Sequence, residues 1–174
     1  MAKLRKGVSY RNVERPYTRK SRYKKKNYIK ANPVNKVVMY DMGDLKKTFE
    51  YTLNLISKDD IQIRHNAIEA ARISSNRHLE KNLGKVGYHL KIRVYPHHIL
   101  RENPVATGAG ADRFSTGMQK SFGKPIGLAA RIRKGQAIFS ASVDKNALEI
   151  AKIALKKAQY KMPCGCIIEL NKNN

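Results

Sequence analysis

The sequence is poor in acidic residues. It has 13 Asp and Glu against 36 Lys and Arg, which gives a formal net charge of +23. This charge is far above what solubility requires, and the acidic partners that normally balance a basic surface are missing. The imbalance therefore argues against a generic solvated surface. It favours a polyanionic partner, because each Lys or Arg that neutralises a phosphate releases condensed counterions.

Long apolar runs and cysteines are also scarce. No stretch of 18 apolar residues is present, so we expect no transmembrane helix. No hydrophobic segment near the start indicates a secretory signal, and neither a Lys-rich amphipathic opening helix nor a lipidation motif indicates a membrane-surface protein. The two cysteines, Cys164 and Cys166, lie one residue apart. We therefore expect no disulfide framework, and a cytoplasmic location is the prediction.

A phosphate-binding loop of the nucleotide-dependent enzymes is not expected. Five residues separate Gly117 from Gly123, and Lys124 is followed by Pro125, whereas that loop needs four intervening residues and then Lys with Ser or Thr. The run from Gly108 to Arg113 breaks the dinucleotide-binding fingerprint at its last position.

Other catalytic and metal-binding arrangements are missing as well. The cysteine pair lacks a second pair, and the adjacent His97 and His98 project in different directions, so no zinc site is expected. No Ser/His/Asp set or carboxylate pair is visible. For Asp112 we favour a structural ion pair or hydrogen bond with Arg113 over a role as general base. The sequence predicts no enzyme, no cofactor and no metal.

Positive charge is concentrated at the N-terminus. The first 36 residues hold thirteen Lys or Arg and one acidic residue, Glu14, so they carry a net +12 (13 − 1). This segment has too few aliphatic residues to form a core, and it would repel itself without a partner. Its tyrosines could stack on unpaired bases while neighbouring arginines hold phosphates. We therefore predict that residues 1–35 are a nucleic-acid-binding arm, with the candidate contacts Lys3, Arg5, Lys6, Arg11, Arg15, Arg19, Lys20, Arg22, Lys24, Lys25, Lys26, Tyr10, Tyr17, Tyr23 and Tyr28.

The remaining residues, 36–174, form one α+β domain by their hydrophobic patterns. Strands are expected at 36–41, 49–56, 88–95, 126–132, 137–143 and 166–170, and helices at 61–83 and 145–159. We expect Gly84 to end the first helix and Asp144 to cap the second. The turn at 133–136 is expected to join its two flanking strands as a hairpin. Strands mixed with helices but without regular crossovers favour a two-layer fold, in which two main helices pack on a mostly antiparallel sheet.

A long glycine-rich loop is expected at 101–125. A loop of this length inside a compact domain is usually functional or disordered, and its glycines let the backbone approach another surface closely. Arg101, Arg113, Lys120 and Lys124 supply charge. We interpret the segment as a flexible finger, with an ordinary surface loop as the alternative.

Three blocks within this loop resemble a known family. They are Ala109–Arg113, Thr116–Met118 and Phe122–Pro125, and they follow Arg93–His98. In this order they resemble the large-ribosomal-subunit protein family called L-sixteen in bacteria and L-ten-e in archaea and eukaryotes. The similarity extends to Tyr10-Arg11-Asn12 and Arg15–Thr18 in the arm and to Met162-Pro163. The C-terminal extension of eukaryotic members is absent after Asn174, so the resemblance is to the archaeal members.

The resemblance implies a structural constituent of the large subunit that performs no catalysis. Such a protein binds large-subunit rRNA near the central protuberance, helps to organise the aminoacyl-tRNA site and places its loop toward the peptidyl-transferase centre. The implied partners are large-subunit rRNA, tRNA in the assembled ribosome, 5S rRNA and neighbouring ribosomal proteins, with no membrane.

Site residues follow from the same resemblance. The arm residues above would contact rRNA, together with Arg72, Arg77 and Arg93. The loop residues that would face tRNA and the peptidyl-transferase centre are Arg101, Gly108, Gly110, Arg113, Thr116, Gly117, Met118, Lys120, Phe122, Gly123 and Lys124. The alternative function is a non-ribosomal RNA- or DNA-binding or DNA-compacting protein, which would explain the charge but not the long glycine-rich finger between core strands.

Overall fold

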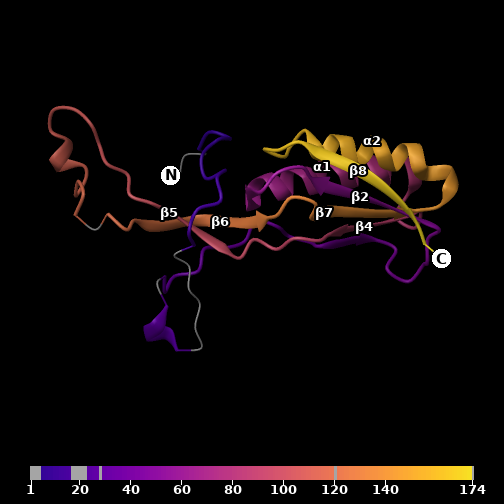
Figure 1. Ribbon diagram of the computed structural model, residues 1–174, viewed down its shortest axis with the longest axis horizontal. Coiled ribbons are helices and arrows are strands. Elements are labelled where there is room, and N and C mark those ends of the chain that lie inside the picture. Colours follow the sequence, from indigo (N-terminus) through magenta and orange to yellow (C-terminus); the bar gives the residue numbers. More distant parts are fainter. Residues whose placement is uncertain (1–4, 17–22, 28, 120, 174) are drawn as a thin grey trace.

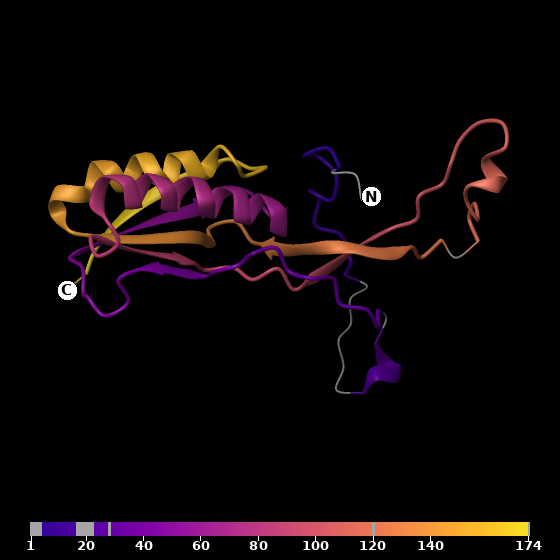
Figure 2. The same cartoon turned by 180° about the vertical axis from the view of Figure 1, so that it is seen from behind.

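The protein is elongated, with a helix layer at one end and a protruding loop at the other (Figures 1 and 2). The computed structural model describes residues 5–16, 23–27, 29–119 and 121–173, without the side chain of Lys24. Two helices and two antiparallel sheets make up the fold, as the α+β prediction requires. Within the described residues, no helix has both the length and the apolar character needed to cross a membrane.

The larger sheet has five strands in the order β1-β4-β7-β2-β8, and every neighbouring pair is antiparallel. Alternation along β2 explains its central place, because Leu53 and Leu55 are fully buried while Asn54 and Ile56 are not. The strands are β1 (Asp41–Gly43), β4 (Tyr88–Ile92), β7 (Ala137–Val143), β2 (Tyr51–Ser57) and β8 (Cys166–Lys172).

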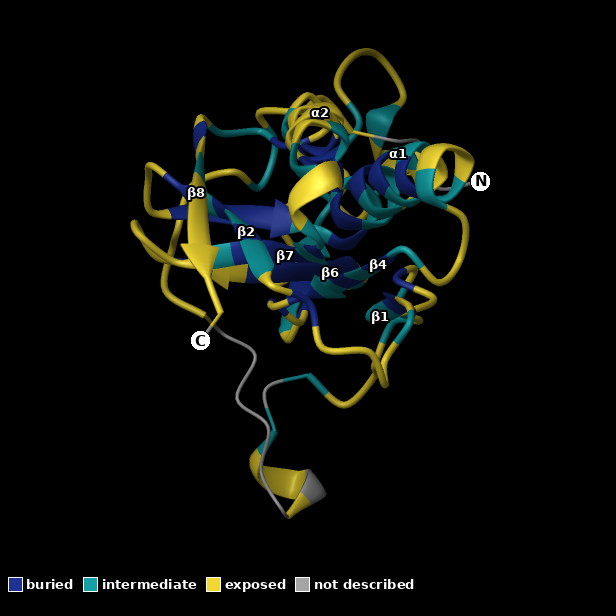
Figure 3. Ribbon diagram, turned by 90° about the vertical axis from the view of Figure 1, so that its right-hand side faces the viewer, coloured by how far each residue is buried: buried dark blue, intermediate teal, exposed yellow. Residues whose placement is uncertain are grey.

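Two helices cover one face of this sheet. They are α1 (His65–Leu83) and α2 (Leu148–Gln159), which pack on each other as well as on the strands. The buried face of α2 is mostly alanine around Leu155, so the helix can approach its neighbours closely. Burial is concentrated between the helices and the strands (Figure 3). As expected, Gly84 ends α1, with φ of 67° and its N–H donating to the Glu80 carbonyl at 3.0 Å.

The smaller sheet carries the loop. Its strands are β3 (Ile61–Arg64), β6 (Lys124–Ile132) and β5 (His98–Glu102), in the order β3-β6-β5. This order repeats that of the strands β2, β7 and β4 in the larger sheet. Short connections at 58–60, 133–136 and 93–97 join each strand to its counterpart. The smaller sheet therefore continues the middle of the larger one, and β5 and β6 extend away from the helices (Figure 1).

The boundary between the two sheets, which the connections 58–60, 93–97 and 133–136 cross, is called the seam below. The predicted hairpin is wrong at this boundary. The turn at 133–136 exists, with the Gln136 N–H donating to the Arg133 carbonyl at 3.1 Å, but β6 and β7 lie in different sheets. Ser57 holds the turn instead: its N–H donates to the Gln136 carbonyl at 3.1 Å, and its carbonyl accepts from the Gly135 N–H at 2.9 Å. The Gly135 N–H and the Gln136 carbonyl are thus bonded to Ser57 and not to the opposite side of a hairpin. The chain therefore passes from β6 in the smaller sheet into β7 in the larger one.

Three other expectations are wrong in detail. The first helix begins at His65, not at residue 61, because Ile61–Arg64 pairs with β6. The expected strand at 36–41 contributes only Asp41 to β1. Asp144 makes no capping hydrogen bond, because its carboxylate accepts from the Lys47 ammonium at 2.7 Å. A short 3₁₀ helix (Lys145–Ala147) leads into α2.

Candidate nucleic-acid interface

The described part of the arm near the N-terminus is anchored through its backbone. Gln62 in β3 donates its N–H to the Arg11 carbonyl at 3.0 Å and its amide Nε2 to the Tyr10 carbonyl at 2.9 Å. The guanidinium of Arg64 donates to the carbonyl of Arg5 at 3.2 Å and to that of Lys6 at 3.0 Å. These contacts hold the arm through its backbone carbonyls, which carry no net charge.

This arrangement leaves the cationic side chains on the outside. Lys6, Arg11 and Arg15 are all exposed, whereas the Arg5 guanidinium forms an ion pair with Glu102 at the end of β5. Such a segment suits phosphate contacts. The exposed side chains of Lys6 and Arg11 can reach a ligand while the backbone contacts that hold the arm stay in place.

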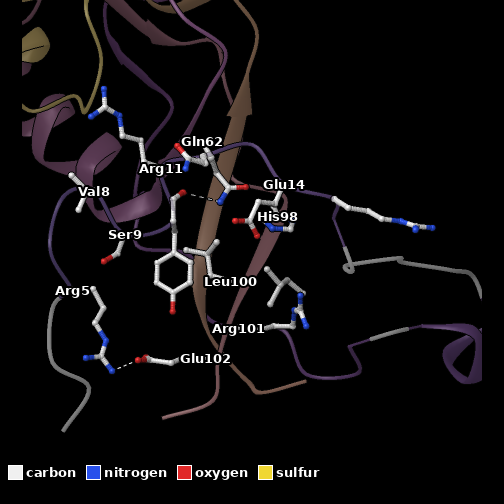
Figure 4. A pocket seen from close by; sticks show the side chains of 14 residues that line it. Arg5, Val8, Ser9, Arg11, Glu14, Gln62, His98, Leu100, Arg101 and Glu102 are labelled. Carbon is white, nitrogen blue, oxygen red and sulfur yellow. Dashed lines mark hydrogen bonds and ion pairs between the residues drawn. The ribbon is translucent and has the colours of Figure 1, made fainter. Parts of the chain in front are cut away.

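A cleft of about 550 Å³ lies between the arm and the smaller sheet. In Figure 4, Glu14 of the arm lies beside His98 of β5, and Arg5 of the arm points toward Glu102 at the other end of β5. Four arginines and two glutamates contribute to its walls, so its lining is mainly polar and charged. Among the described residues, Gln62 Oε1 is the single buried side-chain oxygen or nitrogen without a hydrogen-bond partner, and it leaves an unused acceptor beside this cleft. The residues that line it are Arg5, Val8, Ser9, Tyr10, Arg11, Asn12, Glu14, Arg15, Gln62 and His98–Glu102.

The two described arm tyrosines differ. Burial raises the pKa of the Tyr10 phenol, and the Glu102 carboxylate raises this pKa further. Tyr10 also has a backbone φ of 62°, in the left-handed region that few residues other than glycine adopt. The side chain of Tyr23 is 63% exposed, with the Lys26 ammonium 5.0 Å from its ring centroid. Tyr23 is therefore better placed for stacking than Tyr10, because its ring is more accessible.

The three predicted arginines of the domain also occupy different settings. Arg77 on α1 is exposed. Arg93 is exposed and donates its Nε to the Ser140 hydroxyl at 2.9 Å. Arg72 is half-buried and bonded to Glu69 at 2.6 and 2.9 Å. The hydrogen bond from Arg72 lowers the pKa of the Glu69 carboxyl, so this pair stays charged and holds Arg72 against the helix surface.

The loop between β5 and β6 is anchored at its base. Arg101 donates to the Phe122 carbonyl at 3.0 Å, and its guanidinium carbon lies 4.0 Å from the Phe122 ring centroid. Asn103 donates its amide Nδ2 to the Gly117 carbonyl at 3.2 Å. Gly123 has a φ of +84°, and a Cβ there would lie 2.8 Å from the Glu102 backbone, so the base closes tightly only with glycine.

The tip of the loop is open. A single 3₁₀ turn (Ala111–Arg113) follows Gly110, whose φ is 73°. Phe114 is 85% exposed and Met118 is 75% exposed, although both are apolar. An exposed aromatic ring next to the exposed Arg113 can stack on a base and contact a phosphate at the same time.

One expected contact in the loop is wrong, and several candidate residues lie outside the described part of the chain. No ion pair or hydrogen bond joins Asp112 to Arg113 in the described part of the loop, and both side chains are exposed, so the structural role expected for Asp112 is wrong. No cluster of metal-binding side chains occurs within the ranges that the structure describes. The candidates Lys3, Tyr17, Arg19, Lys20, Arg22, Tyr28 and Lys120 lie outside the described residues, and so does the side chain of Lys24.

Sequence reasoning missed the residues that anchor the arm. Gln62 and Arg64 were placed in a helix, and Glu102 was placed in the loop. A signal was present in Ile61-Gln62-Ile63-Arg64, where apolar and polar residues alternate as in a strand. The pairing that defines this strand, Ile61 with Ile132, joins segments far apart in the chain.

Known proteins match this chain over nearly its whole length. The model of the family described as ribosomal protein L16p/L10e matches residues 15–169. The large ribosomal subunit protein uL16 of Methanococcus aeolicus is 47% identical over 169 residues, covering 97% of this chain and 95% of the relative. The uL16 proteins of Methanoculleus marisnigri and of one Methanococcus maripaludis strain are each 46% identical, over 154 and 169 residues, and cover 88% and 97% of this chain and 88% and 95% of the relatives.

Proposed function

The chain belongs to the ribosomal protein L16p/L10e family, and from this premise we propose that it binds large-subunit rRNA through its arm and exposed cations. Membership in the family makes it a structural constituent of the large ribosomal subunit, of the archaeal type. The proposed role needs no catalytic step by the protein. Its rRNA site is near the central protuberance, where 5S rRNA and neighbouring ribosomal proteins are further partners.

The backbone-anchored arm is the observation that carries this proposal. Its carbonyls are bonded to Gln62 and Arg64, while Lys6 and Arg11 are exposed. The backbone that carries these cations is held in place before RNA arrives, so binding has less of the chain to order. Arg77 and Arg93 extend the exposed positive charge onto the domain.

Salt dependence tests the electrostatic part of the proposal. Binding of the full chain to large-subunit rRNA would be measured over a series of salt concentrations, with Lys6→Ala and Arg11→Ala as variants. Each variant that loses a phosphate contact should reduce the slope of log K against log salt by about 1. Glu14→Gln in the same arm is a control that removes no cation. Binding that does not change between low and high salt would contradict the mechanism.

We further propose that the loop helps to organise the aminoacyl-tRNA site and extends toward the peptidyl-transferase centre. The loop stands at the end of the smaller sheet, away from the helices (Figure 2). Arg113 and Lys124, with Lys120, would steady bound tRNA, while Phe114 and Met118 offer exposed apolar contacts. The contacts from Arg101 to Phe122 and from Asn103 to Gly117 join the two sides of the loop near its base.

Deletion of residues 105–114 tests the loop. This segment contributes no buried core residue, so the variant should keep its secondary structure and its melting temperature. Subunit maturation or tRNA binding should be impaired, as measured by sedimentation profiles and tRNA binding to purified ribosomes. A control that carries Asp112→Asn alone should behave like the unchanged protein. Normal translation rates in the deletion strain would refute this role.

Two measurements separate the ribosomal role from nucleic-acid compaction. Native protein should cosediment with the large subunit in stoichiometric amount. At matched salt, the chain should bind structured rRNA more tightly than duplex DNA. Equal affinity together with absence from the subunit would favour the alternative function.

A further inference from the structure

The two cysteines lie together at the connection from α2 to β8, away from the proposed loop contacts. The Cys164 and Cys166 sulfur atoms are 3.7 Å apart, and both thiols are free. A disulfide holds its sulfurs about 2.05 Å apart, so closure requires an approach of less than about 2 Å. Gly165 between them allows the chain to adjust, because it carries no side chain that must be repacked.

The surroundings make the two thiols unequal. Cys164 is half-buried and accepts a hydrogen bond from the Ser57 hydroxyl at 3.8 Å, while Cys166 is only 7% exposed. The Cys166 thiol donates toward Cys164 and lowers the pKa of the Cys164 thiol to about 7, and the Ser57 hydroxyl and Arg11 act in the same direction. The same contact with Cys164, followed by burial, raises the pKa of the Cys166 thiol. One thiol is therefore nucleophilic near neutral pH, and the other is held in reserve as its proton donor.

We propose that Cys164 and Cys166 form a redox-modification site, at which Cys164 attacks a low-molecular-weight disulfide and Cys166 then closes an intrachain disulfide. In the first step the Cys164 thiolate bonds to one sulfur of the disulfide and expels the other as a thiolate. In the second step Cys166 loses its proton, bonds to Cys164 and expels the remaining small thiolate. The protein loses two hydrogens and two electrons, and one small disulfide is reduced to two thiols.

The site is built into the fold rather than left on a mobile end. The Lys58 N–H donates to the Gly165 carbonyl at 3.1 Å, and Cys166 begins β8, where it pairs with Ser57. Ser57 also holds the turn between the two sheets through its backbone. The thiols therefore react within a fixed frame, which favours closure within one chain over crosslinking between chains.

Exchange with oxidised glutathione tests the proposal on the reduced full-length protein. Intact mass should show the loss of two hydrogens with no lasting adduct, and the rate should rise with pH through about 7. The variant Cys166→Ser should stop at a glutathione adduct on Cys164. The variant Cys164→Ser should react more slowly than Cys166→Ser by at least about tenfold, because the remaining Cys166 thiol is buried, and burial both raises its pKa and limits the access of the oxidant.

A measurement without variants keeps the test independent of their folding. Brief alkylation of the unchanged protein, followed by peptide mapping, should label Cys164 before Cys166, and a denatured sample should label both equally. Equal labelling in the native protein would overturn the proposal. So would a wild-type product that remains a mixed disulfide, or a native protein that stays unreacted while the denatured sample is oxidised.

Discussion

Replacement of Arg64 by methionine should release the N-terminal end of the arm without unfolding the domain. Arg64 ends β3, and its guanidinium donates to the carbonyls of Arg5 and Lys6 at 3.0 to 3.2 Å. Methionine keeps a chain of similar length but donates no hydrogen bond. The contacts from Gln62 to Tyr10 and Arg11 and the ion pair of Arg5 with Glu102 remain, so the arm loses one of its contacts with β3 and keeps the others.

The size of the effect follows from these contacts. A hydrogen bond that involves a charged group contributes about 1.5–3 kcal/mol, and neutral ones about 0.5–1.5 kcal/mol. Because Arg64 is only partly buried, solvent competes for its guanidinium, and we expect a loss of about 1–2 kcal/mol in docking free energy. This corresponds to about a 5- to 30-fold shift toward the undocked arm.

Amide hydrogen exchange measures this shift segment by segment. The Ser9 and Arg11 amides, which donate to backbone carbonyls within the docked arm, should exchange about 5- to 30-fold faster in Arg64→Met, by the free energy above, while β2 and β7 keep their protection. The matched control is Arg77→Met, which replaces an exposed arginine on α1 and should leave the arm unchanged. Equal exchange of the Ser9 and Arg11 amides in both variants, or no protection of these two amides in the unchanged protein, would refute the docking that we describe.

Three further predictions concern the loop base, pH and the core. Gly123→Ala should lower the melting temperature more than Gly108→Ala. Both glycines have a positive φ, which costs about 1–2 kcal/mol in a residue with a Cβ, but only at Gly123 would that Cβ meet the Glu102 backbone. Equal losses in melting temperature would contradict this. Burial, then nearby Lys36 and Arg64, lower the pKa of His65 below 6.5. The unfolded chain therefore binds more protons, and stability should fall as pH drops below about 6.5; His65→Gln should weaken this dependence in thermal melts at pH 5 to 7.5, and an unchanged dependence would argue against it. Leu155→Ala should cost about 2–5 kcal/mol in urea unfolding because Leu155 is fully buried in α2, and a loss below about 0.5 kcal/mol would be inconsistent with its packing.

Local patterns predict the elements whose burial alternates within one segment. The strand expected at 49–56 is found as β2 at Tyr51–Ser57, and the helix expected at 145–159 contains α2. Each element can be predicted from its own residues, because one side of it faces the core along its whole length. The loop was also predictable in outline, since its glycines and its lack of apolar periodicity lie in one continuous stretch.

Partners distant in the chain explain what local patterns could not predict. Ile61–Arg64 follows Asp59 and Asp60 and precedes a true helix, so it was assigned to that helix. Only pairing with β6 makes it a strand. The anchoring of the arm has the same origin, because Gln62 and Arg64 bond to residues about 50 to 60 positions earlier.

The seam between the two sheets determines how the loop tip can move. Three separate connections, at 58–60, 93–97 and 133–136, cross it side by side. A single crossing would act as a hinge, whereas three crossings must bend together. We therefore expect a ligand that displaces the tip to tilt the whole β3-β6-β5 sheet together with the start of α1, which follows β3 directly. Since the arm is bonded to β3 and paired with β5, such a tilt would also move the arm, and the two parts of the proposed RNA-binding surface would shift together.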